Sequence, residues 1–245
     1  MNSRATVFVI INLFAVTAQA IETDIVEQVE DIITGAGASD PERLTNINGT
    51  LYFSAENVPG NRELWRSDGT MPGTYQVKEI NLGANGSSPA GLTNFNGTLF
   101  FLADDGVNGF ELWKSDGTAA GTVQVQDINP GMNGSFPQHL TNVNGTLYFN
   151  AFDSTTGREL WKSDGTGSGT VLVKDINPGV DFSAPSSLTN VNGVLYFAAN
   201  DGVVDKELWR AYVKTDTPPM FDDVPVSHPS SSPTLLSQVI PQGVQ

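Results

Sequence analysis

Four glutamates that recur at intervals of 48 residues are the first candidates for chemistry in this sequence. They are Glu63, Glu111, Glu159 and Glu207, and each opens the run Glu-Leu-Trp followed by Lys or Arg. Glycoside hydrolysis needs two carboxyl groups in different environments, one that holds a proton and one that stays ionised. A glutamate that repeats with the same neighbours does not by itself supply this asymmetry. The spacing therefore favours a structural role.

Each glutamate belongs to a longer repeated signature. The run Glu-Leu-Trp-x-Ser-Asp-Gly-Thr occupies 63–70, 111–118 and 159–166, and a truncated copy occupies 207–210. A second marker, Leu-Thr-Asn-x-Asn-Gly, begins at Leu44, Leu92, Leu140 and Leu188. A fixed period of this length indicates a repeat architecture, in which every repeat is one supersecondary unit. The residues that we therefore assign to the structural signature are Glu63, Trp65, Asp68, Glu111, Trp113, Asp116, Glu159, Trp161, Asp164, Glu207 and Trp209.

Each 48-residue repeat is predicted to form four short β-strands. In the third repeat these strands are expected at 140–143, 146–151, 158–162 and 170–176. Asn144-Gly145 separates the first two, and Asn-Gly between apolar runs is the strongest short signal for a type I′ hairpin turn. Leu147-Tyr148-Phe149 is apolar on both faces of its strand, which indicates a sheet that is buried on both sides. Four-stranded sheets stacked around an axis, as in a β-propeller, meet this condition, and a linear β-solenoid is the alternative.

The two ends of the array complement each other. The fourth repeat stops after its third strand, near Val213, whereas residues 25–32 match the fourth-strand pattern of 170–176. We therefore predict an all-β fold, a four-bladed β-propeller over residues 21–213. The N-terminal strand 25–32 is expected to pair into the last blade and to close the ring, because closure removes exposed sheet edges. The alternative is that two such chains join into an eight-bladed ring.

The repeated signature, followed by Gly-Thr and Val-Lys-Asp-Ile, resembles the ELWxxDGT repeat family. Repeats of this family occur in secreted and surface proteins, mostly bacterial, and are similar to propeller blades. The resemblance covers residues 24–213 and implies export and a propeller-like fold. It implies no catalytic residues. The sequence departs from the family pattern at the fourth copy, where Ala211-Tyr212 replaces Ser-Asp.

The two terminal segments differ from the repeats in composition. Arg4 precedes a mostly apolar run from Ala5 to Val16, and Ala18-Gln19-Ala20 follows, which predicts a secretory signal peptide over residues 1–20. Residues 214–245 are rich in Pro and Ser and are expected to form a disordered tail. We therefore predict a secreted protein, extracellular or periplasmic, that has no membrane span after the signal is cleaved.

The charge and the residue types exclude several functional classes. The chain carries 12 Lys and Arg against 27 Asp and Glu, a net charge of −15, which argues against nucleic acid and anionic membranes as partners. Cysteine is absent from the sequence, and no nucleophile elbow, zinc-protease helix or phosphate-binding loop is found. We therefore predict that the chain is not an enzyme and requires no cofactor.

One side of the predicted blades remains as a candidate binding surface. In an up-and-down blade, the loop between the second and third strands and the connection to the next blade emerge on the same side. The binding residues that we expect there are Asp104, Asp105, Asn108, Asp153, Asp181, Asp201 and Asp205. Asp105, Asp153 and Asp201 share one repeat position and offer the oxygen ligands that calcium prefers, so a calcium site at these three residues is a further hypothesis. Turn formation by Asp-Gly is the alternative explanation.

These observations predict a secreted, non-catalytic binding or scaffold propeller that engages an extracellular protein or polysaccharide. A monomer is expected, with dimerisation as an alternative. A calcium-dependent, lectin-like propeller is the second hypothesis. An enzyme acting on extracellular glycans is the third, and it would need an asymmetric pair of carboxylates in the central channel.

Overall fold

The computed structural model describes residues 25–33, 37–83 and 85–213. The predicted signal peptide (1–20) and the predicted tail (214–245) lie outside these residues. Regular structure in the described part consists of fifteen β-strands and no helix, which confirms the predicted all-β class. Over these ranges, accordingly, no helix is long and apolar enough to cross a membrane.

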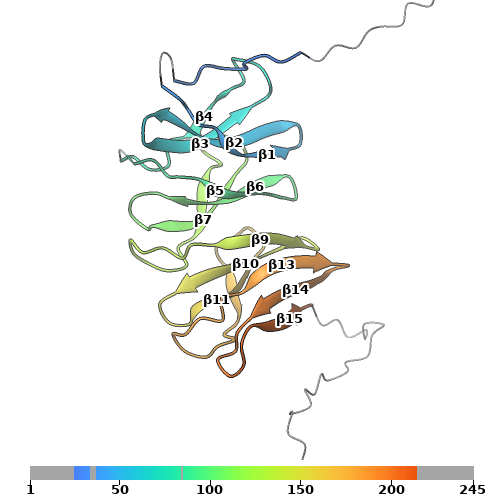
Figure 1. Cartoon of the computed structure of the whole chain (residues 1–245). Helices are drawn as coiled ribbons and strands as arrows, with labels where there is room; N and C mark the ends of the chain where they lie inside the picture. Colours follow the sequence, from blue (N-terminus) through green and yellow to red (C-terminus); the bar gives the residue numbers. More distant parts are fainter. Residues whose placement is uncertain (1–24, 34–36, 84, 214–245) are drawn as a thin grey trace, which may run out of the picture.

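Four antiparallel sheets follow one another along the chain, and the strand order in each sheet is the sequence order (Figure 1). Sheet 1 contains β1 (Glu42–Ile47), β2 (Thr50–Val58), β3 (Asn61–Ser67) and β4 (Tyr75–Lys78). Sheet 2 contains β5 (Ala90–Phe95), β6 (Thr98–Asp104), β7 (Phe110–Ser115) and β8 (Val123–Gln126). Sheet 3 contains β9 (Gln138–Val143), β10 (Thr146–Asp153), β11 (Gly157–Ser163) and β12 (Val171–Lys174). Sheet 4 has three strands, β13 (Ser186–Val191), β14 (Val194–Ala199) and β15 (Glu207–Ala211).

The predicted Asn-Gly turns set the register of the first hairpin in each sheet. Asn144 and Gly145 have φ angles of 51° and 80°, so both occupy the left-handed region that a type I′ turn requires. The Asn142 carboxamide oxygen accepts a hydrogen bond from the Gly145 amide at 3.0 Å, and Val143 pairs with Thr146 across the turn. The prediction of a hairpin at this position is confirmed.

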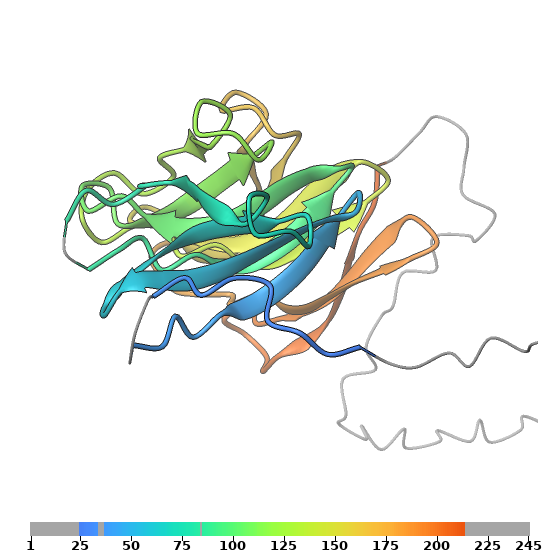
Figure 2. The same cartoon turned by 90° about the horizontal axis from the view of Figure 1, so that it is seen from above.

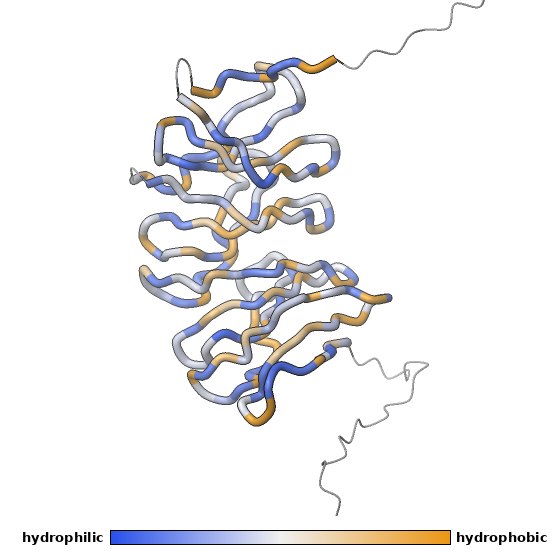
Figure 3. The backbone as a smooth tube through the Cα atoms, in the orientation of Figure 1, coloured by the Kyte–Doolittle hydropathy of each residue, from blue (hydrophilic) through white to orange (hydrophobic). Residues whose placement is uncertain are grey.

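The sheets pack face to face, and the hydrophobic core lies between them. At the first junction, Leu64 of sheet 1 and Ile80 of the following connector pack against Leu99, Phe101 and Trp113 of sheet 2. The residues at the same repeat positions pack between sheets 2 and 3 and between sheets 3 and 4. The first strands of successive sheets also contact one another, β1 with β5, β5 with β9 and β9 with β13. Figure 2 shows this stack from above, and Figure 3 shows hydrophobic residues along the strands and at some loop ends.

The stack is open, which corrects the predicted closure. Sheets 1 and 4 lie at opposite ends of the stack (Figure 1), and sheet 4 ends at β15 without a fourth strand. Residues 25–33 form no strand, and Ile32 packs instead against Phe53, Ala55 and Trp65 on the outer face of sheet 1. The repeat period determines the order of the sheets but not the rotation from one sheet to the next. In this structure, four sheets do not bring the two ends together.

Candidate functional site

Three of the four recurring glutamates, Glu63, Glu111 and Glu159, lie inside the junctions between sheets and connectors. Glu111 in β7 is fully buried, and its carboxyl group accepts hydrogen bonds from the amides of Ile128 and Asn129, both at 3.2 Å, and from the Ser135 hydroxyl. Glu63 and Glu159 are equally buried and bind the corresponding residues of their own connectors. Each glutamate therefore fixes the chain as it leaves one sheet for the next.

Burial changes the acidity of these glutamates. Desolvation raises the pKa of Glu111 from its ordinary value of 4.5 to about 7, against the opposing effect of the hydrogen bonds from Ser135 and the two backbone amides. Desolvation also raises the pKa values of Glu63 and Glu159. A carboxyl group that accepts hydrogen bonds from its own connector inside a closed junction suits a structural role better than contact with a substrate.

The Asp-Gly-Thr part of the signature forms a turn at the exposed end of the third strand. The Asp116 carboxylate accepts hydrogen bonds from the Thr118 amide at 2.9 Å and from the Thr118 hydroxyl at 2.7 Å, and these bonds lower the pKa of Asp116. A Cβ atom added at Gly121 would lie 2.1 Å from the Asp116 Oδ1, so a larger residue there would have to displace the Asp116 carboxylate. Asp68 and Asp164 make the same bonds in their own repeats.

Loops and connectors do meet on one side of the stack. The amides of Ser135 and Phe136 both donate to the Phe110 carbonyl, at 3.0 and 2.9 Å, and the Ala184 amide donates to the Arg158 carbonyl at 3.1 Å. We call this side the loop face. It consists of the loops between second and third strands at 59–60, 105–109, 154–156 and 200–206, and of the described connector residues at 79–83, 85–89, 127–137 and 175–185.

Three of the predicted binding aspartates stabilise their own loops. Asp105 Oδ1 accepts from the amides of Val107 and Asn108 at 2.8 and 2.7 Å. Asp153 accepts from the Thr155 and Thr156 amides at 2.7 and 3.0 Å. Asp201 accepts from the Val203 and Val204 amides, both at 3.0 Å, and these bonds lower the pKa of Asp201. The turn explanation thus accounts for the position of all three carboxylates.

The other predicted residues are spread over the loop face. Asp104 Oδ1 accepts from the Gly106 amide at 2.7 Å. The Asn108 side-chain amide donates to Asp105 Oδ2 at 3.0 Å and to Gln124 Oε1 at 3.1 Å. Asp181 and Asp205 are exposed to solvent in a connector and a loop, respectively.

The structure does not gather the three aspartates that we considered for calcium. They belong to sheets 2, 3 and 4, and each binds within its own loop. In the part of the chain that the structure describes, no three or more His, Cys, Asp or Glu side chains form a group that could hold a metal ion. Calcium binding at Asp105, Asp153 and Asp201 stays a prediction.

A polar pocket of 440 Å³ opens on the loop face between sheets 1 and 2. It is lined by Asn81, Gly83, Asn85, Gly86, Ser88, Asp104, Gly106, Gly109, Phe110 and Met132. Of these, only Asp104 was among the predicted binding residues. Asn81 and Met132 were missed because they lie in connectors, where the sequence shows neighbours along the chain but not which loop will face them.

Large apolar side chains are exposed on the same face, and the search for oxygen ligands overlooked them. Leu82, Met132 and Val203 are 89%, 81% and 87% exposed. Further exposed apolar residues in these loops and connectors are Val107, Phe136, Val180, Phe182 and Val204. The sequence signal was an apolar residue inside a Gly- and Asp-rich connector, as in Gly131-Met132-Asn133 and Gly179-Val180-Asp181.

A second pocket, of 280 Å³, lies between sheets 3 and 4 beside Tyr148. In the two preceding junctions, Gly117 of the signature lies against Tyr52, and Gly165 lies against Phe100. Tyr52 and Phe100 are at the same repeat position as Tyr148. Val213 stands where sheet 4 would carry this glycine, after the signature has ended. The truncated fourth copy therefore leaves this junction less filled.

No family model matches the sequence, and no curated protein matches it. Resemblance to the ELWxxDGT repeat family therefore stays an expectation.

Several solved structures align with part of this chain. A mutant puromycin hydrolase in complex with PGG aligns with a TM-score of 0.46 at 15% identity, over 66% of this chain and 25% of that one. An α-L-arabinofuranosidase from Clostridium thermocellum aligns with a TM-score of 0.34 at 17% identity, over 70% and 67% of the two chains. An exo-β-1,3-galactanase from the same organism aligns with a TM-score of 0.36 at 12% identity, over 69% and 48%.

The prediction that the chain is not an enzyme is contradicted by these neighbours, all of which are enzymes. The chain spans about a quarter of the length of the puromycin hydrolase and of a prolyl endopeptidase, 25% and 24%. No reaction, substrate or catalytic residue is carried over from these proteins.

Proposed function

We propose that this protein is secreted and binds an extracellular protein through its loop face. The observation that carries the proposal is the collection of exposed apolar side chains, among them Leu82, Met132 and Val180, on one side of an otherwise regular stack. Exposed apolar groups that gather on one face, bordered by polar residues, are typical of protein interaction sites. The sheets and their junctions form the scaffold that holds this face.

The charge of the loop face indicates what the partner offers. Asp181 and Asp205 are exposed on this face, and Asp104, Asp105 and Asp201 lie there partly exposed. A partner with basic and apolar side chains would match both features of the surface, since complementary charges favour encounter and register. The 440 Å³ pocket beside Asp104 would accept one side chain of that partner.

A triple variant tests the proposal. Leu82→Ser, Met132→Ser and Val180→Ser together remove apolar side chains from three connectors. The matched control is Met71→Ser, Val123→Ser and Val171→Ser, which removes exposed apolar side chains away from the loop face. Partners are first captured by cross-linking in the extracellular fraction, purified, and then titrated against all three proteins. The loop-face variant should bind at least about tenfold more weakly, a loss of about 1.4 kcal/mol, and the control should bind normally.

Two outcomes would redirect the proposal. Equal affinity of the loop-face variant and the control would show that binding does not use the loop face. A glycan array, read with calcium and again with a chelator, serves as the second arm. Glycan binding that is lost with the chelator would favour the calcium-dependent, lectin-like alternative, and glycan binding that survives the chelator would indicate polysaccharide recognition without a metal.

A further inference from the structure

The outer face of sheet 4 repeats a surface that is buried everywhere else. Leu208 is 75% exposed, whereas Leu64 and Leu112, at the same repeat position, are fully buried against the next sheet. Glu207 is exposed too, although Glu63 and Glu111 are fully buried. Sheet 4 therefore presents the residues of an inter-sheet junction without the sheet that would cover them.

The N-terminal segment carries the other half of such a junction. Ile32 packs on Phe53, Ala55 and Trp65 of sheet 1. In the same way, Ile80 packs on Phe101, Ala103 and Trp113 of sheet 2, and these residues stand 48 positions further along. Ile32 thus occupies the place of a connector residue that follows the fourth strand of a preceding sheet.

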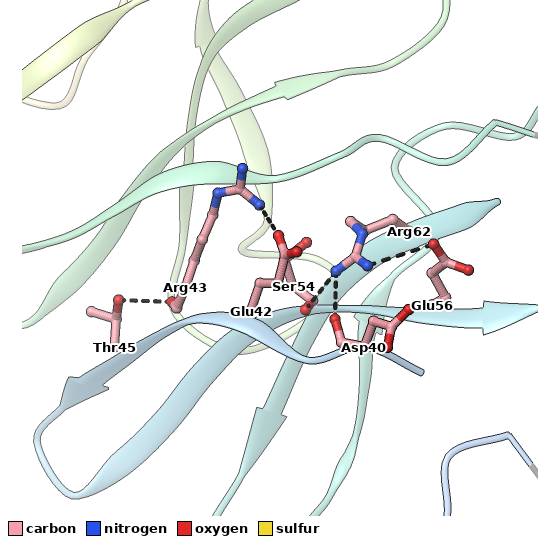
Figure 4. A network of polar contacts seen from close by, with 7 residues as sticks. All are labelled: Asp40, Glu42, Arg43, Thr45, Ser54, Glu56 and Arg62. Carbon is pink, nitrogen blue, oxygen red and sulfur yellow. Dashed lines mark hydrogen bonds and ion pairs between the residues drawn. The ribbon is translucent and has the colours of Figure 1, made fainter. Parts of the chain in front are cut away.

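Residues 39 and 40 also hold the positions of a connector that arrives from a preceding sheet. The Glu56 amide donates to the Ser39 carbonyl at 2.8 Å, as the Phe152 amide donates to Ser135 at 2.8 Å. Figure 4 shows Arg62 donating to the Asp40 carbonyl at 2.8 Å and pairing with Glu56 at 3.5 Å. Arg158 donates to the Phe136 carbonyl at 2.9 Å in the third repeat. Ile32, Ser39 and Asp40 therefore hold the places of residues in a connector that arrives from a preceding sheet.

The two halves match in their hydrogen-bonding groups. Glu111 binds the amides of Ile128 and Asn129 and the hydroxyl of Ser135. Two periods earlier these positions are Ile32, Ile33 and Ser39, and the glutamate that lacks such partners in the repeat pattern is Glu207. Ser39 is half-buried, whereas Ser87, Ser135 and Ser183 are fully buried under their glutamates.

We propose that a second copy of this chain completes the junction. Sheet 4 of one chain docks on sheet 1 of the other, residues 25–32 of the second chain add the fourth strand beside β15, and Glu207 binds Ser39 across the interface. The occupant is another copy because the two end faces carry the residues of the three internal junctions and lie at opposite ends of the stack (Figure 1). Such a contact is head to tail, and two copies that make it twice form a closed ring of eight sheets.

Cysteine cross-linking tests the contact, because the chain has no cysteine of its own. Full chains carrying only Ser39→Cys are mixed with full chains carrying only Glu207→Cys, and a short bis-maleimide is added. A covalent pair made of one chain of each kind is expected. Replacing Ser39→Cys by Ser168→Cys, an exposed position in a distant loop, should abolish the product. The proposal fails if the mixture gives no cross-linked pair. It also fails if cross-linking occurs only in a chain that carries both Ser39→Cys and Glu207→Cys, and only within a monomer, because the chain would then close on itself.

The mass in solution provides a second test with variants that leave the buried core intact. Light scattering should give twice the mass of one chain for the wild type. Leu208→Asp should give single chains, because it places a charge at the centre of the junction. Val203→Asp changes a similarly exposed apolar residue in the loop between β14 and β15, on the loop face, and this variant should remain paired. A wild type that stays single at all concentrations, or a paired Leu208→Asp variant, would overturn the proposal.

Discussion

At the scale of single residues, the buried glutamate explains why the signature begins with an acid. Glu111 accepts three hydrogen bonds inside a junction that excludes water, so its carboxyl group joins a strand to the connector that follows it. The same burial raises its pKa, and stability then depends on pH.

Glu111 is expected to make the protein less stable as the pH rises from mildly acidic to mildly basic. Its pKa is about 7 in the folded chain and 4.5 ordinarily, so the folded state holds more protons between these values. The contribution is fully present below pH 4.5 and is lost as the pH rises through about 7, and a shift of this size corresponds to about 3 kcal/mol. Denaturant unfolding at about pH 5 and about pH 8 measures the slope.

Glu111→Gln should flatten this pH dependence, because glutamine cannot lose a proton. Asp205→Asn is the control, since it removes an exposed carboxylate outside the junctions. If Glu111→Gln and the wild type lose equal stability between the two pH values, protonation of Glu111 does not contribute.

Gly121→Ala should destabilise the chain by roughly 1–3 kcal/mol, because the added methyl group would meet the Asp116 carboxylate. The double variant Asp116→Ala with Gly121→Ala removes the carboxylate and should recover part of this loss. Thermal and denaturant unfolding of the four proteins in the cycle give the coupling energy. Strictly additive effects would show that Asp116 and Gly121 do not constrain each other.

At the scale of elements, each sheet is stabilised by the apolar side chains that it packs against the neighbouring sheet. The second and third strands of each sheet contribute large apolar side chains to both faces, so an internal sheet is covered on both sides. Sheet 4 has the same strands but no covering sheet on its outer face, and Leu208 is exposed there.

Leu112→Ala should cost about 2–5 kcal/mol of unfolding free energy, because a fully buried leucine leaves a cavity between sheets 2 and 3. Leu82→Ala, in an exposed connector, should change the stability by no more than about 0.5 kcal/mol. Urea unfolding monitored by tryptophan fluorescence reports both. A similar cost for the two variants would contradict the packing described for this junction.

At the scale of the whole molecule, the chain is an array in which each sheet mainly contacts its neighbours, so stability should be lowest where a neighbour is missing. The outer face and the free edge of β15 mark that place in a single chain. Hydrogen exchange measures this difference along the array.

Hydrogen exchange in β15 should slow as the protein concentration rises, because a second copy would cover that edge. Amides of β7, which are paired on both sides within one chain, should exchange at a rate that does not depend on concentration. The Leu208→Asp variant should show fast exchange in β15 at every concentration. Exchange in β15 that is independent of concentration in the wild type would contradict association through sheet 4.

The sequence by itself determined the all-β class, the four repeated sheets, the hairpin turns and the side on which loops and connectors meet. These features follow from local signals, such as Asn144-Gly145 for a turn and Leu147-Tyr148-Phe149 for a strand buried on both faces. Because the sequence repeats every 48 residues, corresponding signals recur in the other repeats. The buried glutamates could be assigned to structure for the same reason.

Only the tertiary structure decided where the ends lie and what the loop face presents. The register of residues 25–32 marks them as a fourth strand, but the rotation between packed sheets decides which sheet they can reach, and that rotation depends on side-chain packing along the whole stack. The pocket lined by Asn81 and Met132 arises for a related reason, because two loops from different sheets must face each other to form it. Local sequence specifies each loop, whereas the space between loops is set by the packing of the sheets that carry them.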